Sequence, residues 1–358
     1  MSGYEYGNAR LRAMKSRLLS RRELEALVET GSIQGLIAAL TDTAYRRSID
    51  VALTRTSGLA CIIEALHWDT IHTLGKIRAF YSGQASEMVA VVLRTYDLHN
   101  LKAILRGLAK NVAPDEIRSA LVPIGELRSD ILAELARASD PRAAIDLMAS
   151  MGLAFAQPLL KLRVDQPGAG IPAMELALER WLFREALQYL QHECRDGEPL
   201  PSAIQLEADL VNLLTVLRFV QSPEERKVLR DWLHTEDLDL LFVGPGKLPF
   251  ELLDLAGNRD TIDAAVETFA GTPYEPALRV GLQAYAHSPF LSEFEKQFKR
   301  FRLVWMSRQI ARDPLGIGVL LGYSALKINE VCNIRWIAQG FSLGLSTNTI
   351  RAELEYSE

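Results

Sequence analysis

The chain has 358 residues, 48% of them hydrophobic and 24% charged, and its 40 cations and 45 acids give a formal net charge of −5. A chain of this length and composition can bury one large core or two to three smaller ones, so folding needs neither disulfides nor a metal. The net charge is too small to favour nucleic acid or an acidic substrate as the main partner.

The cysteines and the apolar runs indicate the cellular compartment of the chain and its relation to membranes. Cys61, Cys194 and Cys332 are widely spaced and form no C-x-x-C pair, which is typical of buried thiols in a reducing compartment. The basic N-terminal stretch is not followed by the apolar core of a signal peptide, and no apolar run reaches the roughly 18 residues of a spanning helix. We therefore expect a cytoplasmic protein that touches a membrane only from its surface.

Helical periodicity runs along the chain from the N-terminus. Apolar residues recur at steps of three and four, as in Leu24, Leu27 and Val28 near the start and in Ile117 and Leu121 further on. Alternation with a period of two is nearly absent, so the sequence predicts an all-α fold. Stretches rich in Pro and Gly predict loops between helices. These loops are 166–172, 196–201, 244–249 and 271–276.

One motif recurs along the chain. The stretch YDLHNLKAILRG at 96–107 returns as EADLVNLLTVLRF at 207–219, as KINEVCNIRWIAQG at 327–340 and, more faintly, as YEYGNARLRAMK near the N-terminus. Each copy has an acid three residues before an Asn and a cation two or six residues after it. The residues of this motif are Asn8, Asp97, Asn100, Arg106, Asp209, Asn212, Arg218, Glu330, Asn333 and Arg335. The recurrence favours duplication of a domain-sized unit.

Helix packing explains the motif better than catalysis does. On a helix of about 100° per residue, the acid and the Asn lie on one side of an apolar stripe and the cation lies on the other. Partly buried charges need partners, so we expect Asp97 and Arg106 each to contact a different helix. Catalysis would need one convergent site, whereas this set recurs and His99 occurs in one copy only.

No sequence pattern supports an enzyme. The stretch VGPGKLP at 243–249 invites comparison with a phosphate-binding loop, but Leu241 and Leu248 stand where a Walker sequence needs Gly and Ser or Thr. His67 and His72 are five residues apart, so they cannot face one metal from a helix. We therefore expect no catalytic residue, no cofactor, no metal and no small-molecule substrate.

A basic segment, KQFKRFRLVWMSRQIAR at 296–312, contains six cations and no acid. These candidate docking residues are Lys296, Lys299, Arg300, Arg302, Arg308 and Arg312. The simplest interpretation is a solvated face over the apolar stripe of the same helix. The alternatives are a docking face for an acidic partner, attraction to anionic lipid headgroups, or a nucleic-acid surface. Of these the last is the weakest, and we expect no nucleic-acid partner.

These stretches together resemble the C subunit of the archaeal and vacuolar-type (V/A-type) rotary ATPases and ATP synthases, whose eukaryotic counterpart is the d subunit of the AC39 family. The resemblance rests on YEYGNARLRAMKSRLL, YDLHNLKAILRG, EADLVNLLTVLRF, FVGPGKLPFELL and GYSALKINEVCNIRWIAQG followed by IRAEL, and it spans essentially the whole chain. It implies an all-α funnel of three similar helical-bundle domains about a pseudo-threefold axis. The expected domains are 1–112, 113–222 and 223–358.

The resemblance also implies a function that involves no catalysis by this chain. The chain would be a non-catalytic part of the central stalk, or rotor, peripheral to the membrane on its cytoplasmic side. It would be a socket that couples the D–F shaft to the membrane-embedded proteolipid (c/K/L) ring during ATP-linked proton or sodium transport. A different class of function stays open, namely a helical-repeat adaptor or scaffold unrelated to rotary ATPases.

Overall fold

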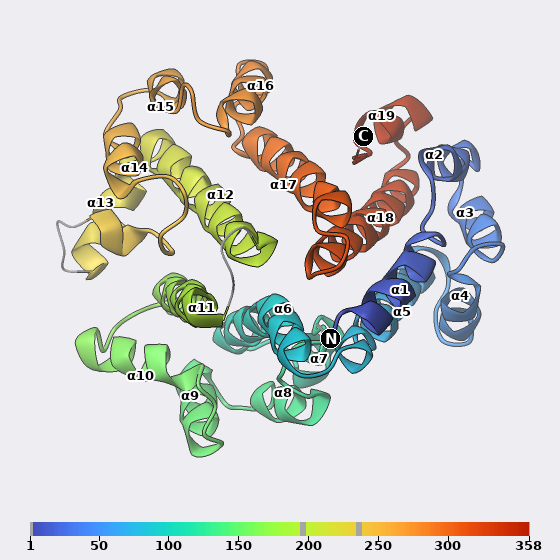
Figure 1. Cartoon of the computed structure of the whole chain (residues 1–358), viewed down its shortest axis with the longest axis horizontal. Helices are drawn as coiled ribbons and strands as arrows, with labels where there is room; N and C mark the ends of the chain where they lie inside the picture. The colour runs from blue at the N-terminus through green and yellow to red at the C-terminus, as the bar shows by residue number, and fades with distance from the viewer. Residues whose placement is uncertain (1–2, 194–197, 234–237, 358) are drawn as a thin grey trace. The chain divides into compact units, whose positions relative to one another are not determined.

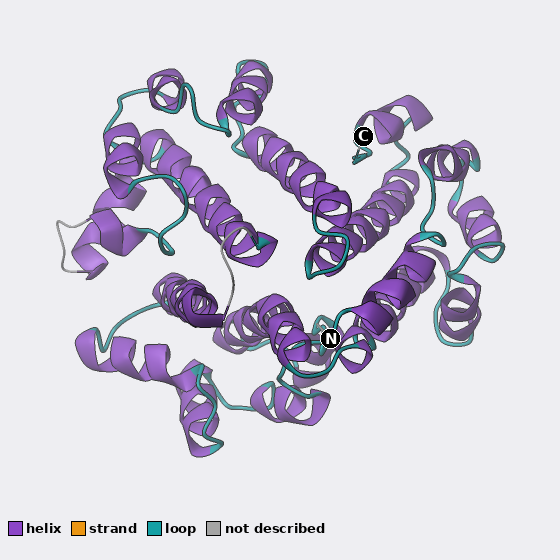
Figure 2. Cartoon of the chain, viewed as in Figure 1, coloured by secondary structure: helices purple, strands orange, loops and turns teal. Residues whose placement is uncertain are grey.

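The computed structural model describes residues 3–193, 198–233 and 238–357, and its regular elements are helices (Figures 1 and 2). No strand occurs in these ranges, so the all-α prediction is confirmed. Cys194 lies outside the described residues. In the same ranges, no helix combines the length and the apolar character that crossing a membrane requires.

The elements follow one another along the chain with short connections. In order they are α1 (Glu5–Lys15), α2 (Arg21–Glu29), α3 (Ile33–Leu40), α4 (Arg46–Leu53), α5 (Gly58–Leu74), η1 (Ile77–Phe80, a 3-10 helix), α6 (Gln84–Ala109), α7 (Pro114–Ser119), α8 (Ser129–Leu135), α9 (Pro141–Ser150), α10 (Ala156–Asp165), α11 (Ile171–Glu193), α12 (Pro199–Gln221), α13 (Pro223–Leu233), η2 (Leu238–Leu241, also 3-10), α14 (Phe250–Gly257), α15 (Ile262–Thr268), α16 (Glu275–Tyr285), α17 (Ser292–Arg312), α18 (Gly318–Ser342) and α19 (Thr347–Ala352).

The chain forms two compact units. Unit 1 contains residues 1–93, 124–126 and 303–358, and unit 2 contains residues 94–123 and 127–302. Unit 1 is therefore built from both ends of the chain, whereas unit 2 is almost continuous in sequence. The threefold funnel and the three domains expected from the sequence stay predictions.

Helix α18 is central to unit 1, where it contacts α1, α2, α3 and α5. Its buried Val331, Ile334 and Ile337 belong to one core cluster with side chains of the N-terminal helices, including Leu27 and Ile62. Burial of a large apolar side chain stabilises a fold by about 1.5–3 kcal/mol. Apolar packing is therefore the main reason that the two ends of the chain stay together.

Unit 2 contains a second core cluster, built around the C-terminal half of α6. Leu101, Ile104 and Leu105 of this helix join buried side chains of α8 to α10, and Leu178 and Leu182 of α11 complete the cluster. Further along the chain, α12 packs against α11, α14 and α15. The motif helices α6 and α12 thus both have a face in the core of unit 2.

The segments that follow the motif have the same geometry in two copies. Gly107 and Gly340 each stand seven residues after a motif Asn, and each lies against an Ile of the next short helix. A Cβ atom on Gly107 would come 2.6 Å from Cγ1 of Ile117, and one on Gly340 would come 2.6 Å from Cγ1 of Ile350. Matching close approaches at matching positions support the duplication that the sequence predicts.

Two residues after the end of each of these two helices, the backbone adopts the left-handed conformation. Asn111 and Gly344 each stand eleven residues after a motif Asn, and their φ angles are 53° and 69°. Side chains other than Asn and Asp rarely adopt this conformation, whereas Gly adopts it freely. The loop that follows each helix therefore starts in the same direction.

Gly344→Ala is expected to lower the free energy of unfolding by about 1 kcal/mol, because the left-handed backbone that Gly adopts without strain is unfavourable for Ala. A Cβ there would meet no atom within 4 Å, so crowding does not contribute. Urea denaturation of the purified chain measures the change. Gly168→Ala, at a position that is equally open and has no positive φ, is the control, and equal losses in the two variants would contradict the argument.

Candidate functional site

Two motif asparagines hold the backbone of a later loop by an identical pair of hydrogen bonds. On α6, the Asn100 side chain donates to the carbonyl oxygen of Val122 (2.8 Å) and accepts from the N–H of the same residue (2.7 Å). On α18, Asn333 bonds in the same way to the carbonyl oxygen (2.8 Å) and the N–H (3.1 Å) of Glu355. A carboxamide has both a donor and an acceptor, which explains why Asn occupies this position.

The copy on α12 uses the same device on a longer loop. On α12, Asn212 accepts from the N–H of Val243 (3.0 Å) and donates to the carbonyl oxygen of Gly244 (3.1 Å). All three asparagines are buried. Because buried backbone groups need partners, each Asn satisfies a loop that would otherwise leave two polar groups unpaired.

The motif acids receive a backbone N–H from the same loops. Asp97 accepts from the N–H of Leu127 (2.9 Å), and Asp209 accepts from the N–H groups of Lys247 (2.8 Å) and Leu248 (3.1 Å). Leu127 and Leu248 each stand five residues after a residue held by the motif Asn. Asp97, which we expected to contact a helix, therefore bonds to the loop that precedes α8.

In the copy on α18, the N-terminal segment supplies the equivalent N–H. Glu330 accepts from the N–H of Leu19, which lies 311 residues away in sequence. Helix α2 begins two residues after Leu19, as α8 begins two residues after Leu127 and α14 two residues after Leu248. The third copy is therefore completed across the two ends of the chain.

Two of the acids also bind a tyrosine that sequence reasoning missed. The Tyr274 hydroxyl, directly before α16, donates to Asp209 (2.6 Å), and the Tyr45 hydroxyl, directly before α4, donates to Glu330 (2.7 Å). The corresponding residue before α10 is Phe155, which has no hydroxyl. Burial raises the pKa of both tyrosines, and the neighbouring carboxylates add to the effect. Burial also raises the pKa of Asp209, although the hydrogen bonds from Tyr274 and from the N–H groups of the loop act in the opposite direction and lower it.

The loop that invited comparison with a phosphate site surrounds an internal anion instead. Its backbone N–H groups point at Asp209, and Gly246 lies so close that a Cβ there would come 1.8 Å from the Oδ1 atom of Asp209. Successive backbone N–H groups in a Gly-containing turn bind anions in general. In this chain, the carboxylate of a motif helix occupies that position.

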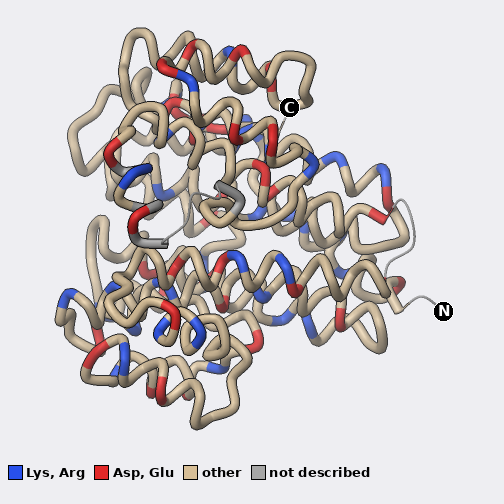
Figure 3. The backbone as a smooth tube through the Cα atoms, turned by 90° about the vertical axis from the view of Figure 1, so that its left-hand side faces the viewer, with Lys and Arg blue, Asp and Glu red and all other residues tan. Residues whose placement is uncertain are grey.

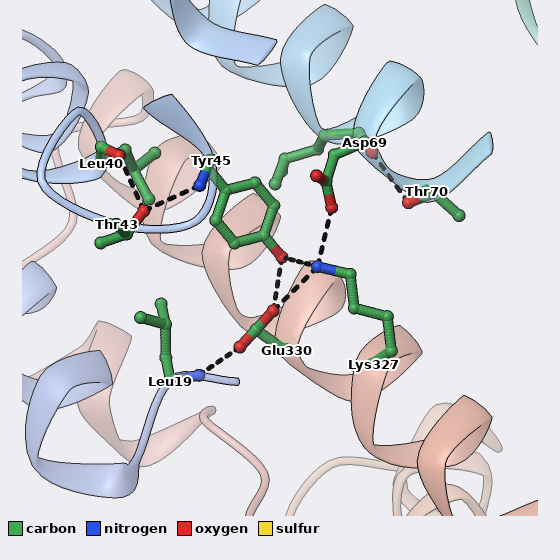
Figure 4. Close-up of polar contacts among 9 residues, drawn as sticks. Leu19, Leu40, Thr43, Tyr45, Asp69, Thr70, Lys327 and Glu330 are labelled. Carbon is green, nitrogen blue, oxygen red and sulfur yellow. Dashed lines mark hydrogen bonds and ion pairs between the residues drawn. The ribbon is translucent and has the colours of Figure 1, made fainter. Parts of the chain in front are cut away.

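A buried charge cluster surrounds Glu330 (Figure 4). Lys327 Nζ lies 2.7 Å from Oδ2 of Asp69 on α5 and 3.0 Å from Oε1 of Glu330, and it donates to the Tyr45 hydroxyl (2.8 Å). The Lys327 and Glu330 side chains are only 5% and 4% exposed. One cation thus lies between two carboxylates, and the cluster joins α18 to the N-terminal helices.

The motif cations have no common role. Arg106 forms an ion pair with Glu175 of α11, whereas Arg218 and Arg335 are exposed. In the faint N-terminal copy, Asn8 is buried, donates to the carbonyl oxygen of Gly316 (2.9 Å) and accepts from the Tyr81 hydroxyl (3.0 Å). His99 is exposed. The acids and asparagines, rather than the cations, carry the common geometry.

The candidate docking residues on α17 differ in exposure. Lys299, Arg300, Arg308 and Arg312 are exposed, Lys296 is half-buried, and Arg302 pairs with Glu207 of α12 (3.1 Å). Elsewhere, cations and acids are interspersed along the backbone (Figure 3). Among the residues that the structure describes, no group of three or more His, Cys, Asp or Glu side chains is placed to hold a metal ion. The site is a set of packing contacts.

Gly246→Ala is expected to lower the free energy of unfolding by about 2–4 kcal/mol, because the new methyl group displaces Asp209 from its donors while leaving it buried. Urea denaturation measures the loss. The control is Gly257→Ala, where a Cβ would meet no atom within 4 Å. A Gly246→Ala variant as stable as the control would show that the loop does not depend on this contact.

Lys327→Met is expected to lower the free energy of unfolding by about 3–5 kcal/mol, because removal of the cation leaves two buried carboxylates without a compensating charge. Adding Glu330→Gln to this variant removes one of the two charges, so part of the loss should be recovered. Thermal and urea unfolding of the single and double variants test this, with Lys110→Met at an exposed position as the control. If the losses of stability of the two single variants simply add up in the double variant, the two side chains do not interact, which would argue against the cluster.

Relatives of the chain cover almost its whole length. The C subunit of an A-type ATP synthase from Methanocaldococcus jannaschii is 24% identical over 99% of this chain and 86% of the relative. The C subunit of an A-type ATP synthase from Methanosarcina acetivorans is 26% identical over 99% of this chain and 93% of the relative. The C subunit of a V-type ATP synthase from Deinococcus radiodurans is 25% identical over 98% of this chain and 91% of the relative. The family described as ATP synthase (C/AC39) subunit matches residues 7–353, and the chain belongs to this family.

Proposed function

We propose that this chain is a non-catalytic central-stalk (rotor) component of a V/A-type rotary ATPase. It would couple the D–F shaft to the membrane proteolipid ring, on the cytoplasmic side, during ATP-linked proton or sodium transport. The family match across residues 7–353 carries the proposal. It also favours this function over an adaptor unrelated to rotary ATPases, because the relatives are named as the C subunits of ATP synthases.

The motif contacts suit a part that transmits torque. Such a part must not let its loops slide along its helices under load. Asn100, Asn212 and Asn333 each fix a loop by two hydrogen bonds. In the copies on α6 and α12, the acid that stands one helical turn before the Asn accepts a further N–H from the same loop. This N–H belongs to a residue five positions after the one that the Asn holds. A buried hydrogen bond to a charged group contributes about 1.5–3 kcal/mol, so these loops are held firmly at two points.

Association with the partners tests the proposal. The purified full chain is mixed with a detergent-solubilised proteolipid ring and, separately, with a D–F shaft complex, and co-elution is followed by size-exclusion chromatography. We expect the chain to co-elute with both and to hydrolyse no ATP by itself. A chain that binds neither partner would remove the rotor proposal and return the adaptor function to first place.

The basic residues of α17 provide a sharper test of where a partner binds. If they form a docking face for an acidic partner, Lys299→Glu with Arg300→Glu should weaken binding of the ring or of the shaft at least about tenfold, since like charges then face each other. The matched control is Lys110→Glu with Lys161→Glu, which changes the same charge at exposed positions of unit 2. Titration by fluorescence anisotropy gives both affinities, and equal affinities would locate the contact elsewhere.

A further inference from the structure

A basic and aromatic surface lies where α1 packs against η1 in unit 1. We define this α1–η1 surface by Tyr6, Arg10, Lys76, Arg78 and Phe80. The two elements approach closely because Gly7 lies against the ring of Tyr81, where a Cβ would come 2.2 Å from the Cε1 atom. Residues about 70 positions apart in sequence are thereby brought onto one surface.

Phe80 is the centre of this surface. The ring of Tyr6 meets it edge-on, with centroids 6.3 Å apart and an interplanar angle of 85°. The guanidinium carbon of Arg10 lies 5.1 Å from the centroid of the same ring. Arg10 is exposed and Tyr6 is 62% exposed, so an aromatic ring and a cation both face solvent.

Lys76 and Arg78 flank the aromatic centre. In a 3-10 helix the side chains at i and i+3 eclipse, so the buried Ile77 and the half-buried Phe80 point the same way. Lys76 and Arg78 consequently project to the two sides of Phe80, and both are exposed. Within the described ranges, no carboxylate lies at ion-pair distance from Lys76, Arg78 or Arg10.

We propose that the α1–η1 surface binds anionic lipid headgroups at the face of a membrane. Three unpaired cations on a chain of formal charge −5 form a local positive field that complements a negative leaflet. An exposed Tyr has an apolar ring and a polar tip, which suits it to the boundary between headgroups and acyl chains. The exposed ring of Tyr6 therefore favours a lipid surface over an acidic protein, for which the cations alone would suffice.

Vesicle co-sedimentation tests the proposal with the purified full chain. The probes are vesicles of phosphatidylcholine alone and of phosphatidylcholine mixed with phosphatidylglycerol. We expect binding to the mixed vesicles only, weakened by added salt. Arg10→Gln, Lys76→Gln and Arg78→Gln together should lower the partition coefficient on the order of 100-fold, at about fivefold per cation. Tyr6→Ser should lower it without changing the charge.

The matched control removes the same charge from exposed positions of unit 2, by Lys110→Gln, Arg137→Gln and Lys161→Gln. This variant should bind as the unaltered chain does, and circular dichroism checks that all variants are folded. An equal loss in the control, or no binding to the mixed vesicles, overturns the proposal. Binding to soluble polyglutamate but not to vesicles also overturns it and assigns the surface to an acidic protein. The assay contains neither ring nor shaft, so its outcome is independent of the rotor proposal.

Discussion

The rest of the structure depends on a buried carboxamide that bonds to both kinds of polar group in a loop backbone. Asn100, Asn212 and Asn333 each satisfy an N–H and a carbonyl group of the chain that follows their helix. This pair of bonds fixes where the loop passes, so that the acid one turn earlier can receive a second N–H and the next helix can start. A backbone N–H or carbonyl group that is shielded from water needs another partner, and the motif Asn supplies one for each kind of group.

The copy of the motif on α18 has the most charged groups around its acid. It is also the copy in which the acid and its N–H donor are farthest apart in sequence. In the α6 and α12 copies, the acid and its N–H donor are 30 and 39 residues apart in sequence, whereas Glu330 and Leu19 are 311 residues apart. Closing a longer loop costs more conformational entropy. The additional contacts of Lys327 with Asp69 and Tyr45 occur in this copy.

The sequence predicted the all-α fold and the repeated acid and Asn positions, because helical period and internal similarity are local properties of the chain. It did not predict the partners, because a backbone N–H carries no side-chain signature. Tyr45 and Tyr274 were missed since they act on acids 285 and 65 residues away. The loop at 244–249 was expected to be only a turn before a helix, and that two of its backbone N–H groups bond to Asp209 of the same chain could not be read from the sequence. Of the motif cations, Arg106 contacts another helix as expected, through Glu175 of α11, whereas Arg218 and Arg335 are exposed.

The completion of unit 1 by both ends of the chain has a consequence for biosynthesis. The helices α2 to α5 leave the ribosome first, but the apolar side chains of α18 that cover them are made last. At about 5–20 residues per second, the translation of unit 2 in between takes on the order of 10–40 s. Throughout this interval the N-terminal helices lack their core partner. A chain that terminates before α18 therefore never closes unit 1.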